Sequence, residues 1–314
     1  MKIKNCLIVD DLHPIAISLL EEAGITIHSD ENLTREEILK ILPDYDCLLI
    51  RSKTVVDEDF LHNAPKLKII GRAGAGVDQI DQELLKRKNI ALVNAPEGNM
   101  TAVGEHAIGM LLALMNNMMR ADFQVRNQKW ERELNRGYEI EGKTIAIIGY
   151  GNMGNAFAKR LQGFNCNIIT YDKFKTNYGN KYAKQVSLIE IFETADILSL
   201  HVPLNKSSFH MVNKKFLNSF KKPIWLVNLA RGKVITNKDL LDALNNGNVK
   251  AAALDVIENE KFNTYTKEEN TIFEQLKQTN KVIFSPHIGG WTFESLSKIS
   301  EVLANKIIDF SNKS

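Results

Sequence analysis

The chain has 314 residues, of which 44% are hydrophobic and 25% charged, and its formal net charge is +2. This length exceeds one average domain, so it predicts two domains with sizeable cores. The near-neutral charge argues against nucleic acid or an anionic membrane as a partner. Three widely spaced cysteines without a CxxC pair predict buried free thiols rather than disulfides or a metal site.

The apolar runs are too short for a targeting or membrane segment. In the N-terminal stretch MKIKNCLIVDD the apolar run ends at two aspartates, which predicts a first strand rather than a secretion signal. The longest apolar run, IGMLLALM at 108–115, is far shorter than a bilayer span. Together with the free thiols, these features predict a cytoplasmic protein.

Short β-branched runs alternate with amphipathic stretches along most of the chain. Helices are expected at 13–24 and 34–43, among others, and strands at 3–9, 46–51, 67–71, 90–93, 143–149, 167–172, 196–201, 224–229, 250–255 and 281–285. This alternation predicts the α/β class, with doubly wound parallel sheets.

The stretch from about Thr101 to Trp130 interrupts this alternation and predicts one long helix. Its first half is apolar almost all round, so we expect it to be buried on more than one side. It is either a core helix between domains or, in part, a contact surface for a second subunit.

The stretch GKTIAIIGYGNMG contains the pattern Gly149-x-Gly151-x-x-Gly154, which follows a predicted strand and opens a predicted helix. In this context the first glycine permits a tight turn, the second admits a pyrophosphate, and the third lets helix and strand pack closely. The helix N-terminus adds free N–H groups and the positive end of its dipole. The pattern therefore predicts dinucleotide binding, with a turn that binds no ligand as the alternative.

The next strand, NIITYD, ends in Asp172. A carboxylate at this point can accept hydrogen bonds from the adenosine ribose and would repel a 2′-phosphate. We therefore predict NAD rather than NADP as the cofactor, a preference that Lys173 and Lys175 weaken only slightly.

Three polar residues follow three predicted strands: Arg231 after IWLVNLA, Glu260 after AAALDV and His287 after KVIFS. Ligands of such sheets bind beyond the carboxyl ends of the strands, so these side chains should meet at one edge. Each alone is equally explained as a solvated or locally bonded loop residue. Together they suit hydride transfer on a 2-hydroxy or 2-keto acid, with histidine as acid and base, the carboxylate fixing its tautomer and arginine gripping a substrate carboxylate.

The motifs together resemble the D-isomer-specific 2-hydroxyacid dehydrogenase family over essentially the full length. The stretches that carry the resemblance are GRAGAGVDQID (71–81), NAPEGNMTAVGEH (94–106), GKTIAIIGYGNMG (142–154), LHVPL (200–204), VNLARGKVI (227–235), AALDVIENE (252–260) and SPHIGGWT (285–292). Within the family, the first two look most like the phosphoglycerate dehydrogenases.

The resemblance implies a role for each matching position. It makes Arg231, Glu260 and His287 catalytic, and it places the cofactor on Gly149, Gly151, Asn152, Met153, Gly154, Asp172, Ala230, Asp255 and Gly290. Of these, Asn152 and Met153 would meet the pyrophosphate and Asp255 the nicotinamide carboxamide. The substrate carboxylate would bind the backbone of Gly74, Ala75 and Gly76, and Arg51 would reach a substrate phosphate.

The resemblance also implies a two-domain topology. Residues 1–95 and 289–314 would form a flavodoxin-like substrate domain, and residues 96–288 a Rossmann domain that binds NAD. The active site would lie in the cleft between these domains, and the helix region 101–130 would form a homodimer.

Two residues depart from the family pattern. Lys261 stands where a proline commonly follows the catalytic glutamate, so we expect a differently shaped loop after Glu260. Trp291 replaces the small residue usual after HIGG in phosphoglycerate dehydrogenases, and we expect its bulk to crowd or reshape the pocket. The chain ends at Ser314, so feedback through a C-terminal regulatory domain is not expected.

Three functions remain open at this stage. The leading one is oxidoreduction of 3-phosphoglycerate and 3-phosphohydroxypyruvate in serine biosynthesis. The second is reduction of glyoxylate, hydroxypyruvate or another 2-keto acid, and the third is a corepressor-like protein that senses the nucleotide without catalysis.

Overall fold

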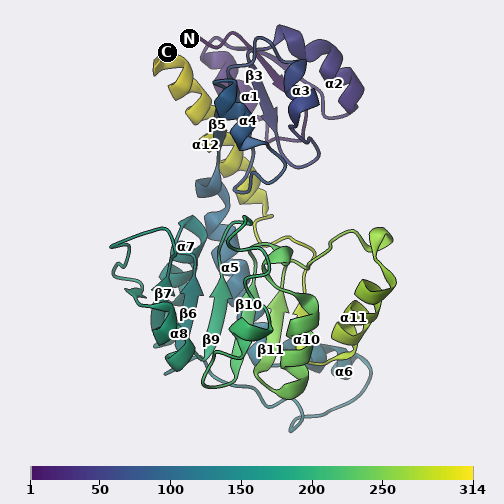
Figure 1. Ribbon diagram of the computed structural model, residues 1–314, viewed down its shortest axis with the longest axis vertical. Coiled ribbons are helices and arrows are strands. Elements are labelled where there is room, and N and C mark those ends of the chain that lie inside the picture. The colour runs from purple at the N-terminus through teal and green to yellow at the C-terminus, as the bar shows by residue number, and fades with distance from the viewer. Residues whose placement is uncertain (1, 314) are drawn as a thin grey trace. The chain divides into compact units, whose positions relative to one another are not determined.

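The structure is a computed structural model that describes residues 2–313, and it divides into two compact units (Figure 1). Unit 1 comprises the described residues up to Met100 and those from Trp291 onward, and unit 2 comprises Thr101–Gly290. Each unit has its own parallel sheet and its own apolar core. The two units are therefore described separately.

Unit 1 contains a five-stranded parallel sheet in the order β2-β1-β3-β4-β5, the order of flavodoxin-like folds. Its strands are β1 (Asn5–Ile8), β2 (Thr26–Ser29), β3 (Cys47–Ile50), β4 (Ile69–Arg72) and β5 (Ala91–Asn94). Its helices are α1 (Ile15–Glu22), α2 (Arg35–Ile41), α3 (Glu58–His62), α4 (Gln82–Arg87) and α12 (Phe293–Lys313), with a short 3-10 turn at Leu42–Asp44.

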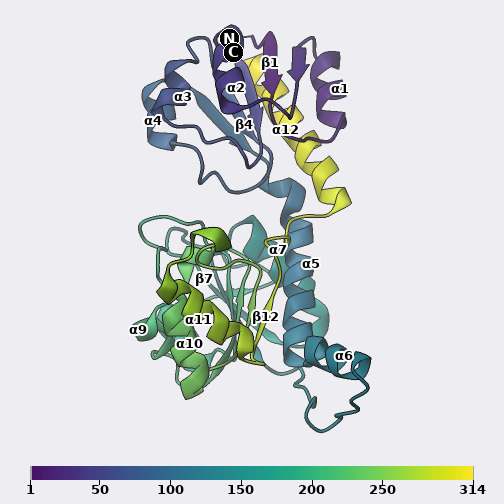
Figure 2. The same cartoon turned by 90° about the vertical axis from the view of Figure 1, so that its right-hand side faces the viewer.

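The C-terminal helix α12 belongs to the core of unit 1, where it lies beside α1 (Figure 2). Its buried residues recur every three or four positions, which turns one face toward the sheet: Ser295, Ile299, Ser300, Leu303, Ala304 and Ile307. They pack with fully buried strand residues such as Cys6 and Leu49. The last helix of the chain thus completes the unit that the first strands begin.

Unit 2 contains a seven-stranded parallel sheet in the order β12-β11-β10-β9-β6-β7-β8. Numbered within the unit, this is the Rossmann order 3-2-1-4-5-6 with one further strand at the end. The strands are β6 (Thr144–Ile148), β7 (Asn167–Tyr171), β8 (Lys184–Gln185), β9 (Ile197–Leu200), β10 (Ile224–Asn228), β11 (Val249–Leu254) and β12 (Val282–Phe284).

Helices cover the sheet of unit 2, and two apolar clusters contain its buried strand residues. The helices are α5 (Pro96–Met115, in unit 2 from Thr101), α6 (Met118–Arg126), α7 (Asn152–Arg160), α8 (Leu188–Thr194), α9 (Lys214–Leu217), α10 (Asn237–Asn246) and α11 (Lys267–Gln278). Short 3-10 turns lie at Leu161–Phe164, Gly232–Val234 and Phe262–Thr264. The predicted fold class is confirmed in both units.

All ten predicted strands are present, but the sequence prediction missed β2 and β8. Both missed strands lie at sheet edges and are largely exposed. An exposed edge strand needs no apolar run, so the pattern on which the prediction rests is absent from them.

The prediction of one helix from Thr101 to Trp130 is wrong. The helix begins earlier, at Pro96, and ends at Met115, and the separate helix α6 ends before Trp130. Asn117 takes a left-handed conformation (φ 53°), and the Tyr138 N–H donates to the Met115 carbonyl at 3.0 Å. The break therefore depends on a later segment that returns to the end of α5, which the local pattern does not reveal.

The first half of that stretch is buried along one face, whereas Glu105 and Gly109 on the opposite side of α5 are exposed. The expectation of burial on more than one side is therefore not met within unit 2. The residues Val103, Ala107, Met110, Leu111, Leu114 and Met115 are all buried in one cluster with strand residues of unit 2. By contrast, α6 has no buried residue. Among the helices of residues 2–313, none has both the length and the apolarity required to cross a membrane.

Candidate active site

The register of three adjacent parallel strands aligns the candidate catalytic loops of unit 2. Asn228 at the end of β10 pairs with Leu254 at the end of β11, and Leu254 pairs with Phe284 at the end of β12. Arg231 and His287 each follow by three residues, and Glu260 lies in the loop after β11. The three residues therefore leave the same edge of the sheet, as the sequence predicted. The neighbouring strands β10 and β11 are labelled in Figure 1.

His287 and Glu260 are in direct contact. The His287 Nδ1 lies 3.1 Å from the Glu260 Oε2, and the two side chains are 48% and 45% exposed. An ionised carboxylate can only accept hydrogen bonds, so Nδ1 carries the proton and donates it. The Nε2 of the neutral ring then has a free lone pair, as a general base requires.

His287 has an unusual backbone conformation, with φ at 56°. Left-handed values are costly for residues with a Cβ, so surrounding contacts must hold it. The His287 N–H donates to the Asp255 carbonyl at 2.8 Å. The next two N–H groups, of Ile288 and Gly289, donate to the Asp255 carboxylate at 2.9 and 2.8 Å. Asp255 therefore binds three consecutive N–H groups of the histidine loop.

The Asp255 carboxylate is buried, with 2% of the residue exposed. Burial alone would raise the pKa of this carboxyl, but the nearby His106, whose Nε2 lies 3.6 Å from the Asp255 Oδ1, and hydrogen bonds from Ser285, Gly289 and Ile288 hold the pKa below its ordinary value. The carboxylate is thus charged at neutral pH and can keep the histidine loop in place.

His106 and Ser285 are site residues that the sequence analysis did not identify. The Ser285 hydroxyl donates to the Asp255 Oδ1 at 2.5 Å, and the His106 Nε2 lies 3.0 Å from the same hydroxyl oxygen. Because the Ser285 hydroxyl donates its one proton to the Asp255 carboxylate, the His106 Nε2 must donate to the Ser285 hydroxyl oxygen. The sequence around His106 does not indicate this role, because only the tertiary fold brings α5 to this loop.

The turn that carries Arg231 is fixed by Asn228, which is 1% exposed. Its side-chain oxygen accepts from the Ala230 N–H at 3.0 Å, and its side-chain nitrogen donates to the Arg231 carbonyl at 3.1 Å. A Cβ on Gly232 would lie 1.7 Å from the Ile257 carbonyl oxygen. Only glycine therefore lets this turn approach the segment that leads to Glu260.

The Glu260 loop is built around Lys261, at the position where the family commonly has proline. Lys261 has φ at −104°, outside the range that a proline ring allows, and its N–H donates to the Asn259 Oδ1 at 3.0 Å. Proline has no N–H for this bond. The expectation of a different loop shape at Lys261 thus has a physical basis.

The glycine-rich turn joins β6 to α7, whose first residues are Asn152 and Met153. Gly149 has φ at 91°, and a Cβ on Gly154 would lie 2.2 Å from the Gly149 carbonyl oxygen. A Cβ on Gly151 would meet no atom within 4 Å. The turn therefore requires Gly154 for its own packing but not Gly151, whose open side suits a ligand that approaches the backbone closely.

Asp172 follows β7 and is bound to this turn. Its Oδ2 accepts from the Tyr150 N–H at 2.9 Å, and its Oδ1 accepts from the Phe174 N–H at 3.0 Å. Lys175 donates to the Tyr150 carbonyl at 2.9 Å, so this lysine is engaged with the turn itself. A carboxylate beside a glycine-rich turn fits the ribose of a dinucleotide.

The other predicted cofactor residues lie near the catalytic loops in the chain. Ala230, between Asn228 and Arg231, is buried, whereas Gly290 is partly exposed after the histidine loop. Within residues 2–313, no group of three or more His, Cys, Asp or Glu residues lies close enough to hold a metal ion.

The predicted substrate residues lie in unit 1, each after a strand of its sheet. Arg51 directly follows β3, and Gly74, Ala75 and Gly76 lie in the loop after β4. The carbonyls of Gly74 and Ala75 accept from the Ala95 N–H at 2.9 Å and the Asn94 Nδ2 at 2.6 Å. These bonds fix the loop and use only its carbonyl groups.

The hydrogen bonds between Asp255 and the loop at 287–289 lead to a prediction about stability at different pH values. At pH 7, Asp255→Asn lowers the free energy of unfolding by about 1–3 kcal/mol, because an amide cannot accept at both side-chain atoms and leaves a buried donor unpaired. The folded-state pKa of Asp255 is depressed, so its stabilisation is lost as the pH falls through that pKa. The difference in unfolding free energy between wild type and variant should therefore shrink as the pH falls from neutral into the acid range below the ordinary pKa of a carboxyl group.

Urea denaturation across this pH range measures the gap, and the exposed Asp242→Asn is the matched control in unit 2. A gap that stays constant down to the lowest pH would show that the charge of Asp255 does not stabilise the loop.

Comparison with known proteins identifies the family of the chain. Residues 108–289 match the model described as D-isomer specific 2-hydroxyacid dehydrogenase, NAD binding domain. The chain is 37% identical to the hydroxypyruvate reductase of Thermotoga maritima over 303 residues, 95% of either chain. It is also 37% identical to the D-3-phosphoglycerate dehydrogenase of Methanocaldococcus jannaschii over 306 residues, which are 96% of this chain but only 56% of that relative.

Solved structures agree with this result over nearly the whole chain. A glyoxylate reductase from Paecilomyes thermophila superposes with a TM-score of 0.87 and 26% identity, over 100% of this chain and 97% of that one. The D-lactate dehydrogenase from Aquifex aeolicus, complexed with NAD and lactic acid, gives 0.83 and 25% identity, over 99% and 96%. The chain therefore belongs to the D-isomer-specific 2-hydroxyacid dehydrogenase family, and residues 108–289 carry that family's NAD-binding domain.

Proposed function

We propose that this protein is an NAD-dependent oxidoreductase that transfers a hydride between the cofactor and C2 of a D-2-hydroxy acid or 2-keto acid. We propose 3-phosphoglycerate and 3-phosphohydroxypyruvate as its substrate pair, which would place it in serine biosynthesis, with reduction of the keto acid as the favoured direction. The observation that carries this proposal is the 3.1 Å contact between His287 and Glu260 at the sheet edge from which the Arg231 loop also leaves. The three unpaired cysteines fit our proposal of a reducing cytoplasm.

The residues of unit 2 fit a bound dinucleotide. The open side of Gly151 and the N-terminus of α7 suit a pyrophosphate, which Asn152 and Met153 would meet, and Asp172 suits the ribose. The Asp255 Oδ2 accepts from the Gly289 N–H, and a second lone pair of a carboxylate oxygen would accept from the carboxamide, while Ala230 and Gly290 would line the ring. NAD, when bound, supplies the hydride acceptor or donor.

The proton step is assigned to His287. In oxidation, C2 loses a hydride while its hydroxyl group gives the proton to the His287 Nε2, and the C2–O double bond forms. Glu260 holds the ring through Nδ1 and stabilises the imidazolium that results. In reduction the same Nε2 returns the proton to the C2 oxygen.

The remaining roles concern substrate binding. Arg231 would grip the substrate carboxylate and polarise the C2 oxygen, because a planar guanidinium fits oxyanions bidentately. The N–H groups of Gly74, Ala75 and Gly76 donate to no acceptor among residues 2–313, which supports carboxylate binding by this loop. Arg51 would bind the substrate phosphate.

A second candidate keeps the chemistry and changes the substrate to hydroxypyruvate, glyoxylate or another 2-keto acid. A relative that matches along nearly its whole length is named hydroxypyruvate reductase, whereas the chain spans about half the length of the phosphoglycerate dehydrogenases of Methanocaldococcus jannaschii and Archaeoglobus fulgidus. Rates measured with a panel of 2-keto acids and NADH, with NADPH as the cofactor control, distinguish the two candidate functions. Failure to reduce phosphohydroxypyruvate at millimolar concentration would refute the leading substrate.

The glycine-rich turn predicts opposite behaviour for two alanine variants. Gly154→Ala should lower the free energy of unfolding by roughly 1–3 kcal/mol, because the Cβ collides with backbone. Gly151→Ala should leave unfolding unchanged but weaken NADH binding by roughly tenfold, because its methyl group occupies the pyrophosphate's approach. Denaturation without cofactor and titration with NADH measure the two effects. Wild-type NADH affinity in Gly151→Ala would place the pyrophosphate elsewhere.

Removal of the imidazole tests the proton step. His287→Asn should lower kcat for keto-acid reduction by about 10²–10⁴-fold, because the C2 oxygen loses its proton donor. NADH binding, measured separately, should change little. His62→Asn, an exposed histidine of α3, is the control and should retain wild-type turnover. Full activity in His287→Asn would refute the mechanism, and a wild type without turnover would favour a nucleotide-sensing protein.

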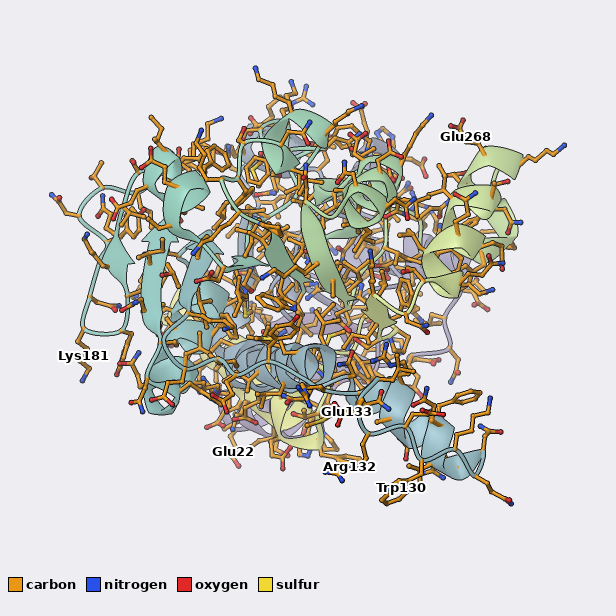
Figure 3. The ribbon with its side chains drawn as sticks, turned by 90° about the horizontal axis from the view of Figure 1, so that it is seen from below. Glu22, Trp130, Arg132, Glu133, Lys181 and Glu268 are labelled. Carbon is orange, nitrogen blue, oxygen red and sulfur yellow. The ribbon has the colours of Figure 1, made fainter. Side chains whose placement is uncertain are left out.

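We also propose a homodimer formed by α6 and the loop after it. Large apolar side chains are exposed along this segment, including Met119, Phe123, Trp130 and Tyr138 at 58%, 68%, 78% and 58%. α6 and this loop stand away from the sheet of unit 2 (Figure 2), and Trp130 points away from the ribbon (Figure 3). Exposed apolar surface of this extent is typical of an interface.

Phe123→Asp should shift the protein from dimer to monomer in light scattering after size exclusion, because the charge would be buried in the interface. Phe174→Asp replaces another exposed aromatic residue of unit 2, at 72% exposure, and should remain dimeric. A wild type that is monomeric at micromolar concentration would contradict the dimer.

A further inference from the structure

Arg51 and Trp291, two residues of unit 1 from opposite ends of the chain, form a stacked pair. The Arg51 guanidinium carbon lies 3.7 Å from the centroid of the Trp291 ring. The arginine side chain is 11% exposed, whereas Trp291 is 61% exposed. The indole thus covers one face of a cation that is otherwise largely enclosed, which is the arrangement of a cation–π pair.

The backbone of Arg51 is fixed from both sides. Its N–H donates to the buried Asp10 carboxylate at 2.5 Å, and its carbonyl accepts from the Gln79 Nε2 at 2.7 Å. The side chain therefore leaves a rigid point at the end of β3. A guanidinium that is fixed at its base and stacked on its face loses little further freedom when it binds a ligand.

The in-plane donors of the guanidinium are only partly used. Within residues 2–313, its hydrogen bonds both come from Nη1, which approaches the Asp11 carbonyl and the Asp11 Oδ2 at 3.4 Å. The Asp11 side chain is 60% exposed, so its long contact with Arg51 is weak and a ligand can displace it. Nε and Nη2 form the opposite edge, a fork that matches two oxygens of a phosphate or carboxylate.

We propose that Trp291 is a specificity-determining residue that orients the Arg51 fork toward an oxyanion group on the substrate, so that phosphorylated 2-keto acids are preferred. This inference rests on the proposed function and deepens it. Trp291 touches the arginine through the π-face and leaves the edge available for the ligand. The bulky residue that departs from the family pattern therefore supports anion binding instead of crowding it.

Kinetics with a matched pair of substrates test the proposal. Trp291→Ala should lower the ratio of kcat/KM for phosphohydroxypyruvate to that for hydroxypyruvate by about 3- to 30-fold, the range of a stacked cation–π pair. The loss should lie in KM for the phosphorylated substrate, with kcat nearly unchanged. Trp291→Phe should keep most of the ratio, because it retains an aromatic face. Phe293→Ala, a neighbour that is 96% exposed, should keep all of it.

A double-mutant cycle shows whether Trp291 acts through Arg51. In an Arg51→Ala background, Trp291→Ala should have no further effect on the ratio, because there is no guanidinium left to orient. Equal losses on both substrates, an unchanged ratio, or additive effects in the double variant would each overturn the proposal.

A binding measurement keeps this inference separate from the proposed function. Inorganic phosphate, added at constant ionic strength, should change the tryptophan fluorescence of the wild type and not of Trp291→Phe or Arg51→Ala. A phosphate response without keto-acid turnover would refute the proposed function and support the anion site. Turnover of phosphohydroxypyruvate without a change of ratio in Trp291→Ala would refute the role of Trp291 alone.

Discussion

The parallel register of β10, β11 and β12 is the constraint on which the candidate active site depends. It aligns Asn228, Leu254 and Phe284, so the loops that carry Arg231, Glu260 and His287 begin at the same level of one sheet edge. A shift of one residue would turn the strand side chains to the other face and misplace every loop. Strand pairing therefore determines where these loops begin. Local hydrogen bonds then determine their conformation.

Two buried polar residues supply those local bonds. Asp255 binds the N–H groups around His287, and Asn228 binds both sides of the Arg231 turn. Hydrogen bonds contribute most where water is excluded, and both Asp255 and Asn228 are buried. Each holds a loop whose candidate catalytic side chain is more accessible, His287 being exposed and Arg231 partly exposed. The positions of the His287 and Arg231 loops thus depend on the buried side chains of Asp255 and Asn228.

Features that depend on the strand pattern and on motif spacing were predicted from the sequence. Features that depend on tertiary contacts were not. The ten predicted strands, the glycine-rich turn and the positions of Arg231, Glu260 and His287 at one sheet edge follow from apolar runs and the parallel-sheet rule. The break at Asn117, the bond from His106 to Ser285 and the Arg51–Trp291 stack join residues far apart in the chain. Trp291 in particular was expected to crowd a pocket, because the sequence does not show that its ring meets a guanidinium.

The central claim is hydride transfer between the cofactor and C2 of a D-2-hydroxy acid, and isotopic labelling tests it most directly. The protein is incubated with a 2-keto acid from the panel and NADH deuterated at the transferable position. The 2-hydroxy acid formed is then analysed by chiral chromatography and mass spectrometry. The account predicts one deuterium atom at C2 of the D-isomer. A product without deuterium at C2, or an L-configured product, would contradict it.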